Sequence, residues 1–280
     1  MKYDNLTPLD KGEVLSEEQA LAQLNKYKSQ SPQSSSYIHL KDVSCIKNLI
    51  NPPVEHYESL YISKNLVGPP VSLPIDHWIH NFNLNNQKTG HFLASLPLTC
   101  NILKECYKRG VLKRSNNTYE TINPSLDRLL CNYLKLVTPA QNTIIHWDTN
   151  QIINYPHKAA YLKNHSTSDL FLIRQHRQTY MVPFSSAVNQ TLINQPEKVN
   201  YKSSHPNVRA FVQSLTCLEE EDFQNLADYI ANDIIIHLPK NRERITTVAM
   251  GLHPSGLNIY TSLRIDKPLV AHSTTTKYPK

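Results

Sequence analysis

Residues Leu96–Ile122, with the sequence LPLTCNILKECYKRGVLKRSNNTYETI, decide the fold that we expect around them. From Leu98 onward the apolar residues recur at intervals of three and four, which places them on one face of a helix. Pro97 suits the first helical turn, because the amide hydrogen that it lacks would have had no partner there. Gly110 follows the apolar series at a position where glycine commonly ends a helix. The stretch therefore predicts an amphipathic helix that stops at Gly110.

A two-stranded ribbon is expected directly after this helix. Val111–Arg114 and Thr118–Ile122 are rich in β-branched and aromatic residues, and they flank the polar turn Ser115–Asn117. This order is a hairpin signal. The helix and the first strand carry five cations against one acid, Glu105. The cations are Lys104, Lys108, Arg109, Lys113 and Arg114.

The helix, the glycine and the ribbon resemble the recognition helix and wing of a winged helix-turn-helix. The resemblance covers about residues 71–122, where we expect two earlier short helices, at 72–82 and 87–96. It implies that the third helix enters the major groove of DNA while the ribbon contacts phosphate. Thr99 and Asn101, early in the helix, would contact base edges, and the five cations would contact phosphate. In the alternative interpretation, these polar residues only solvate a helix of an ordinary α+β domain.

Composition and charge place the chain among globular proteins. Of its 280 residues, 40% are hydrophobic and 19% are charged, which suits one large domain or two modest ones. The net charge of +6 and a pI of about 8.9 permit an anionic partner. Five cysteines without a CxxC pair argue against a disulfide framework or a zinc ribbon. No apolar run approaches the ~20 residues that span a bilayer, so we expect a cytoplasmic protein without a membrane partner.

The patterns predict an α+β protein in three parts. Residues 1–36 form an N-terminal helix and a linker, residues 37–139 form a helical domain with the candidate winged helix, and residues 140–280 form an α+β domain. The N-terminal half is thus expected to be helical, with only short strands at 37–40 and 58–63.

The C-terminal half has a different pattern. Short β-rich runs divided by polar turns indicate a mixed or antiparallel sheet. Apolar residues at helical spacing from Phe223 to Ile235 predict a long helix, begun by a capping box of Thr216 and Glu219. Two strands, at 245–252 and 257–265, are expected after it.

The segment 219–265 faintly resembles the opening of the cytidine-deaminase fold. That family continues with His-x-Glu and Pro-Cys-x-x-Cys, which hold a zinc-activated water and its proton shuttle. Here His272-Ser273-Thr274 follows, with no glutamate or cysteine pair after it. The resemblance therefore implies no working deaminase.

Other constellations predict no catalytic residue, metal site or cofactor. His77 and His80 are three apart on an expected helix, but no acid or cysteine stands at ligand spacing. His146 and Asp148 are a base and an acid, but strand geometry is not expected to pair them. Six glycines in the whole chain disfavour a phosphate-cradling loop.

The leading functional hypothesis is a nucleic-acid-binding, and more specifically DNA-binding, protein. Two alternatives stay open. One is a non-catalytic protein-interaction or effector-like module that docks a protein partner through a sheet edge or helix. The other is an enzyme with an unrecognised site in the histidine-rich C-terminal half, which a cluster of histidines would reveal.

Overall fold

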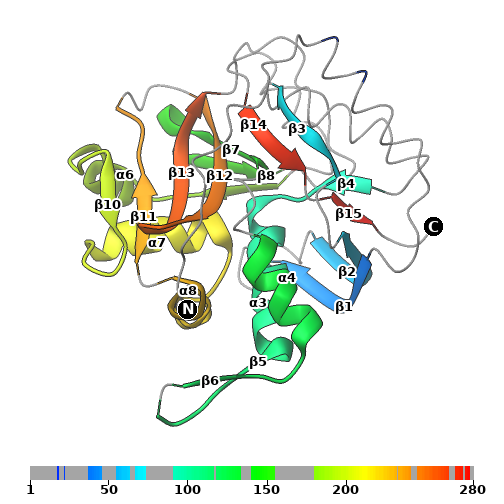
Figure 1. Cartoon of the computed structure of the whole chain (residues 1–280). Coiled ribbons are helices and arrows are strands. Elements are labelled where there is room, and N and C mark those ends of the chain that lie inside the picture. Colours follow the sequence, from blue (N-terminus) through cyan, green and yellow to red (C-terminus); the bar gives the residue numbers. More distant parts are fainter. Residues whose placement is uncertain are drawn as a thin grey trace.

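The computed structural model describes Glu18, Ala22 and a series of longer segments (Figure 1). These segments are 37–45, 55–63, 67–73, 91–116, 118–133, 140–154, 180–231, 233–240, 245–264, 269–273 and 275–277. Most of the helix and linker expected within residues 1–36 lies outside the described residues, and so do His77 and His80.

The prediction of a helical N-terminal half is wrong. The described residues before 94, apart from Glu18 and Ala22, form strands. These are β1 (Tyr37–Cys45), β2 (Glu55–Ser63), β3 (Val67–Leu73) and β4 (His91–Leu93). β1, β2, β15 (Thr275–Lys277) and β4 form one sheet in that order, and β3 pairs with β14 (Leu269–Ser273). The structure describes only parts of the ranges 72–82 and 87–96, where two helices were expected. Up to the start of α3, these parts contain strand residues and no helix. β3 extends into the first range and β4 lies in the second.

The C-terminal half contains a seven-stranded mixed sheet, which Figure 1 shows as curled. β11 and β13 run parallel, and the other neighbouring strands run antiparallel. In spatial order the strands are β10 (Lys198–Asn200), β11 (Ile234–His237), β13 (Gly256–Arg264), β12 (Ile245–His253), β7 (Ala140–His146), β8 (Gln151–Asn154) and β9 (Tyr180–Pro183).

The long helix expected after Thr216 is shorter than the apolar pattern indicated. Helix α8 covers Glu220–Ile230, and Glu219 at its N-cap makes no side-chain capping bond. Ile234 and Ile235 belong to strand β11, where buried and half-buried residues alternate. A run of β-branched isoleucines fits a strand as well as a helix face, and here the strand pairing decides. Two further helices were not predicted, α6 (Ser186–Ile193) and α7 (Pro206–Thr216).

The helix predicted from Leu98 is confirmed as α3 (Leu96–Gly110), and it lies within the core. Its N-cap is Ser95, whose hydroxyl accepts the Leu98 amide at 3.3 Å. The Leu96 amide donates to Thr143 Oγ1 of β7 at 2.9 Å, which ties the helix to the large sheet. α3 also packs against β1, α4 (Pro124–Tyr133), α7 and α8. The described core therefore joins elements on both sides of the domain boundary predicted at 139/140, and that boundary stays a prediction.

None of the helices in the described part of the chain is long and apolar enough to cross a membrane.

Candidate functional site

The predicted ribbon is present and projects from the lower end of α3 (Figure 1). It consists of β5 (Val111–Lys113) and β6 (Tyr119–Thr121). The Arg114 amide donates to the carbonyl of Thr118 at 2.8 Å near the tip, and the Ile122 amide donates to that of Gly110 at 2.9 Å at the root. We call this element the hairpin.

The root of the hairpin is held by α4 and α8. A Cβ atom on Gly110 would lie 3.1 Å from the amide nitrogen of Asp127, so glycine permits this close approach of α3 to α4. The Asp127 carboxylate accepts hydrogen bonds from Thr121 Oγ1 and from the Tyr229 hydroxyl, each at 2.6 Å. The rings of Tyr119 and Tyr229 meet edge to face, with centroids 4.9 Å apart.

Burial, with the hydrogen bond to Asp127 as a second cause, raises the pKa of Tyr229 well above its usual value. The phenol therefore stays protonated and keeps donating to Asp127. One face of the hairpin is consequently fixed to the body of the protein.

The opposite face of the hairpin, which we call the outer face, consists of Leu112, Arg114, Glu120 and Ile122. Side chains alternate along a strand, so Leu112 and its cross-strand partner Glu120 point away from the face that Val111 and Thr121 share. Leu112 is 43% exposed and Ile122 is 54% exposed, although both are large and apolar. Arg114 and Glu120 form an ion pair between exposed side chains on the same face.

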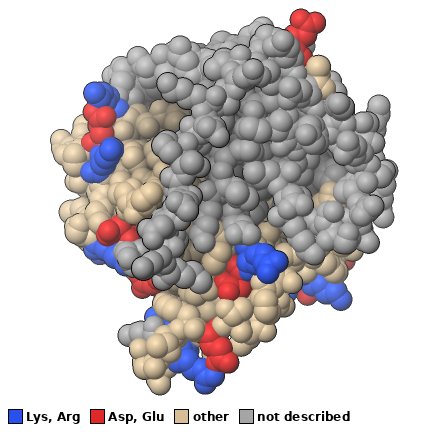
Figure 2. Space-filling view, viewed as in Figure 1, with Lys and Arg blue, Asp and Glu red and all other residues tan. Residues whose placement is uncertain are grey.

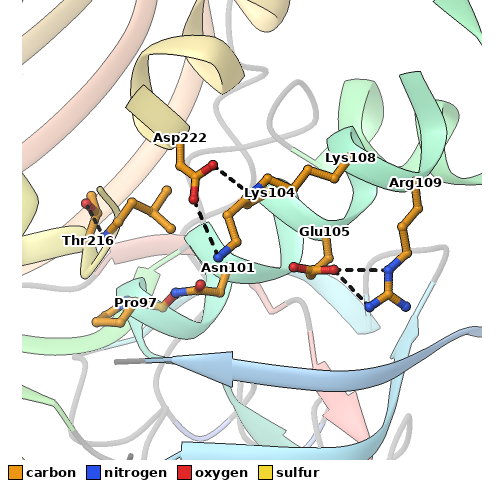
Figure 3. Close-up of polar contacts among 9 residues, drawn as sticks. Pro97, Asn101, Lys104, Glu105, Lys108, Arg109, Thr216 and Asp222 are labelled. Carbon is orange, nitrogen blue, oxygen red and sulfur yellow. Dashed lines mark hydrogen bonds and ion pairs between the residues drawn. The ribbon is translucent and has the colours of Figure 1, made fainter. Parts of the chain in front are cut away.

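The predicted phosphate-binding cations of α3 meet an acid from another helix (Figure 3). Asp222, in the first turn of α8, lies 2.8 Å from Lys108 Nζ and 3.9 Å from Lys104 Nζ. The Lys104 side chain is only 14% exposed. These two lysines therefore fasten α3 to α8.

The remaining cations, Arg109, Lys113 and Arg114, lie further along the chain, and their surroundings differ from one another. Arg109 pairs with Glu105 at 2.8 Å and also donates to the carbonyl of Lys41 at 3.0 Å. Arg114 pairs with Glu120, as stated above. Lys113 is exposed and forms no ion pair with any residue that the structure describes. Figure 2 accordingly shows basic and acidic side chains intermixed on the protrusion at the lower edge of the molecule.

The predicted base-contacting residues are buried. Thr99 has no exposed surface and Asn101 has 2%. The Asn101 side-chain amide donates to the carbonyl of Pro97 at 2.8 Å, within the same helix. The amphipathic pattern had placed both residues outside, but neighbouring elements cover the early part of α3 on both sides. Neither side chain can reach a base edge in this conformation.

Two histidines of the C-terminal half do come together, on strands β11 and β12. The ring of His237 stacks on Tyr260 at 4.2 Å, and the ring of His253 meets the same tyrosine edge-on at 5.9 Å. Burial, and secondarily the charge of His237, lowers the pKa of His253. Asn258 Oδ1 contacts His237 Nε2 at 2.6 Å. Within the described segments, no group of three or more His, Cys, Asp or Glu is arranged to hold a metal ion.

His146 and Asp148 also pair, contrary to the prediction. The strand ends at His146, and the 3-10 turn Trp147–Thr149 brings Asp148 Oδ1 to 2.6 Å from His146 Nε2. The turn, which the strand pattern did not indicate, directs the two side chains toward each other.

Sequence reasoning also missed Asp222 and Tyr229, because each meets α3 or the hairpin from a distant part of the chain. It missed Asp127 as well, although this residue lies only six positions after its partner Thr121. The outer face had a local signal, since Leu112 follows the apolar Val111 and so falls on the other side of the same strand. Comparisons of the chain with protein-family models, with curated proteins and with solved structures found no match.

Proposed function

We propose that this protein is an interaction module that docks a protein partner through the outer face of the hairpin. The observation that carries the proposal is the exposure of Leu112 and Ile122 on an element that projects from the body and is fixed from behind. A hairpin held at its root loses little conformational freedom on binding, so more of the contact energy appears as affinity.

The charge pattern favours a protein over a polyanion. Phosphate binding depends on positive charge that is free to replace counterions. Four of the five predicted cations are instead paired with acids of this chain. Apolar side chains are enriched at the centres of protein interfaces, and charged side chains lie mainly at the rim.

The partner would carry an apolar groove for Leu112 and Ile122. The hairpin is small compared with the ~800 Å² that each partner buries in a standard interface, so the contact is of the transient class or is extended by neighbouring surface.

The test uses a matched control, because Ile193 is the third large apolar residue exposed in the described part of the chain and lies on α6. Wild-type protein, the Leu112→Ser/Ile122→Ser variant and Ile193→Ser are used as bait in lysate treated with nuclease. A captured protein is then purified and its binary affinity measured. We expect the hairpin variant to bind at least about tenfold more weakly, with Ile193→Ser unchanged. Equal affinities for all three baits, or capture of no protein, would refute the proposal.

Nucleic-acid binding is a second candidate, favoured by the net charge of +6 and by the exposed Lys113 on the hairpin. In this candidate function, the hairpin contacts phosphate groups and makes no contact with base edges. A gel shift at several salt concentrations tests it, with Lys198→Ala, an exposed site on β10, as the control for Lys113→Ala. Loss of one phosphate contact lowers the salt slope by about 1. An identical slope in both variants would remove this candidate.

We also propose that the protein is located in the cytoplasm, whichever of the two functions it has. It is supported by the odd number of cysteines and by the burial of Cys100 and Cys106 as free thiols. Cell fractionation tests it, and recovery of the protein in a secreted fraction would contradict it.

A further inference from the structure

The turn between β7 and β8 brings an acid, an imidazole and a hydroxyl together, far from the hairpin in sequence. Asp148 Oδ1 lies 2.6 Å from His146 Nε2, and Thr149 Oγ1 lies 2.8 Å from the other ring nitrogen, Nδ1. The three side chains therefore form one chain of contacts, from carboxylate to imidazole to hydroxyl.

The proton positions follow from what each group can donate. An ionised carboxylate only accepts, so in the neutral imidazole the hydrogen lies on Nε2, facing Asp148. Nδ1 is then the acceptor, and the Thr149 hydroxyl donates to it. The other acceptors near this hydroxyl are more distant, with the His146 carbonyl at 3.3 Å and Gln151 Oε1 at 3.5 Å. The Thr149 hydroxyl proton thus points at Nδ1 of His146. When this nitrogen takes up a proton, the Asp148 carboxylate would stabilise the resulting imidazolium.

The turn is held firmly, and its threonine is an exposed residue. His146 pairs with residues of both β8 and β12, and its side chain is 8% exposed. The neighbouring Trp147 is buried and its indole nitrogen donates to Thr246 Oγ1 at 2.8 Å. Thr149 is exposed at the end of the 3-10 turn. A buried base that contacts the hydroxyl of an exposed residue is an arrangement that can activate a nucleophile.

We propose that Thr149 is the nucleophile of an acyl-transfer site for carboxylic esters. Thr149 Oγ attacks the ester carbonyl carbon while its proton moves to His146 Nδ1, and Asp148 stabilises the resulting imidazolium through Nε2–H. The tetrahedral intermediate collapses with cleavage of the bond to the alcohol oxygen. The leaving alcohol takes the proton from Nδ1, and an acyl-threonine ester remains.

The second half of the reaction returns the site to its starting state. Water attacks the acyl carbon and gives a proton to His146 Nδ1. The carboxylic acid leaves, and the Thr149 oxygen recovers the proton. No oxidant, reductant or further reactant is needed.

The experiment uses p-nitrophenyl acetate with the full-length protein. We expect a burst of p-nitrophenol and an acetyl group on the Thr149 peptide, located by mass spectrometry. Thr118 is the internal control, because it is also exposed but its hydroxyl contacts the Asn116 carboxamide instead of an imidazole. Thr149→Ser should retain the burst and Thr149→Ala should lose it.

The base and its partner are tested separately, with folding checked by near-ultraviolet circular dichroism. Removing a general base typically slows a reaction by about 100-fold or more, and we expect this for His146→Gln. Asp148→Asn, at a half-exposed side chain, should fold normally, slow the burst and shift its pH profile, as expected of a positioning residue. If His146→Gln does not fold, Asp148→Asn and Thr149→Ala decide the matter. Acetylation of Thr149 no faster than that of Thr118, or a burst unchanged in Asp148→Asn, would overturn the proposal.

Discussion

Replacing Asp127 by alanine removes the side chain that fastens the hairpin to the rest of the protein. Its carboxylate accepts two hydrogen bonds of 2.6 Å, one from Thr121 in β6 and one from Tyr229 in α8. It also lies in the first turn of α4, where a negative charge is favourable. Asp127→Ala should therefore loosen the hairpin and lower the stability of the whole chain.

The size of the effect follows from the exposure of each contact. The bond from Tyr229 is partly buried and contributes about 1.5 kcal/mol, as a hydrogen bond to a charged group does. The bond from Thr121 is exposed and contributes about 0.5 kcal/mol. The helix position adds about 0.5 kcal/mol. The sum of about 2.5 kcal/mol corresponds to a fall in Tm of roughly 5–10 °C for a chain of this size.

Differential scanning calorimetry measures this change. Tyr229→Phe removes one bond and keeps the ring contact with Tyr119, and Thr121→Val removes the other bond alone. Their effects should be smaller than that of Asp127→Ala and should rank with Tyr229→Phe the larger. A Tm for Asp127→Ala within about 1 °C of the wild-type value would correspond to well under 1 kcal/mol and would refute the anchoring role.

Three further substitutions test the packing. Gly256→Ala should destabilise the protein by about 3 kcal/mol or more in chemical denaturation. The reason is that Gly256 has φ +121° and that a Cβ would lie 2.3 Å from the Asp233 carbonyl oxygen. A loss of less than about 1 kcal/mol in the free energy of unfolding would contradict this strain. Burial raises the pKa of Cys106 to about 12, so the free energy of unfolding should fall as pH rises from the ordinary thiol value of 9.0 toward 12, and Cys106→Ala should flatten that slope. The buried Tyr201 hydroxyl has no hydrogen-bond partner among the described residues, so Tyr201→Phe should raise stability by about 1 kcal/mol in the same assay; a loss of stability would show that the hydroxyl is satisfied.

Local signals in the sequence were sufficient for α3 and the hairpin. The apolar spacing from Leu98, the proline in the first turn and the polar turn that begins at Ser115 each depend on neighbours in sequence. The residues that the structure describes there are placed as expected. Strand β2 was found by the same kind of signal.

Local sequence signals could not predict which elements surround α3. Thr99 and Asn101 look like surface residues on a helical wheel, but α3 packs against elements from both halves of the chain. The charge of Lys108 looks free until Asp222, more than a hundred residues later, is placed beside it. Burial and ion pairing depend on tertiary contacts, and these decided which predicted site residues are accessible.

The outer face of the hairpin is tested most directly by photo-cross-linking. Benzoylphenylalanine is placed at position 112, at position 122 and, as the control, at position 193, and each protein is irradiated in lysate with and without nuclease. We expect a nuclease-resistant protein adduct from the two hairpin positions that the control position does not give. Identical adducts from all three positions, or adducts that disappear with nuclease, would contradict a protein-docking role for Leu112 and Ile122.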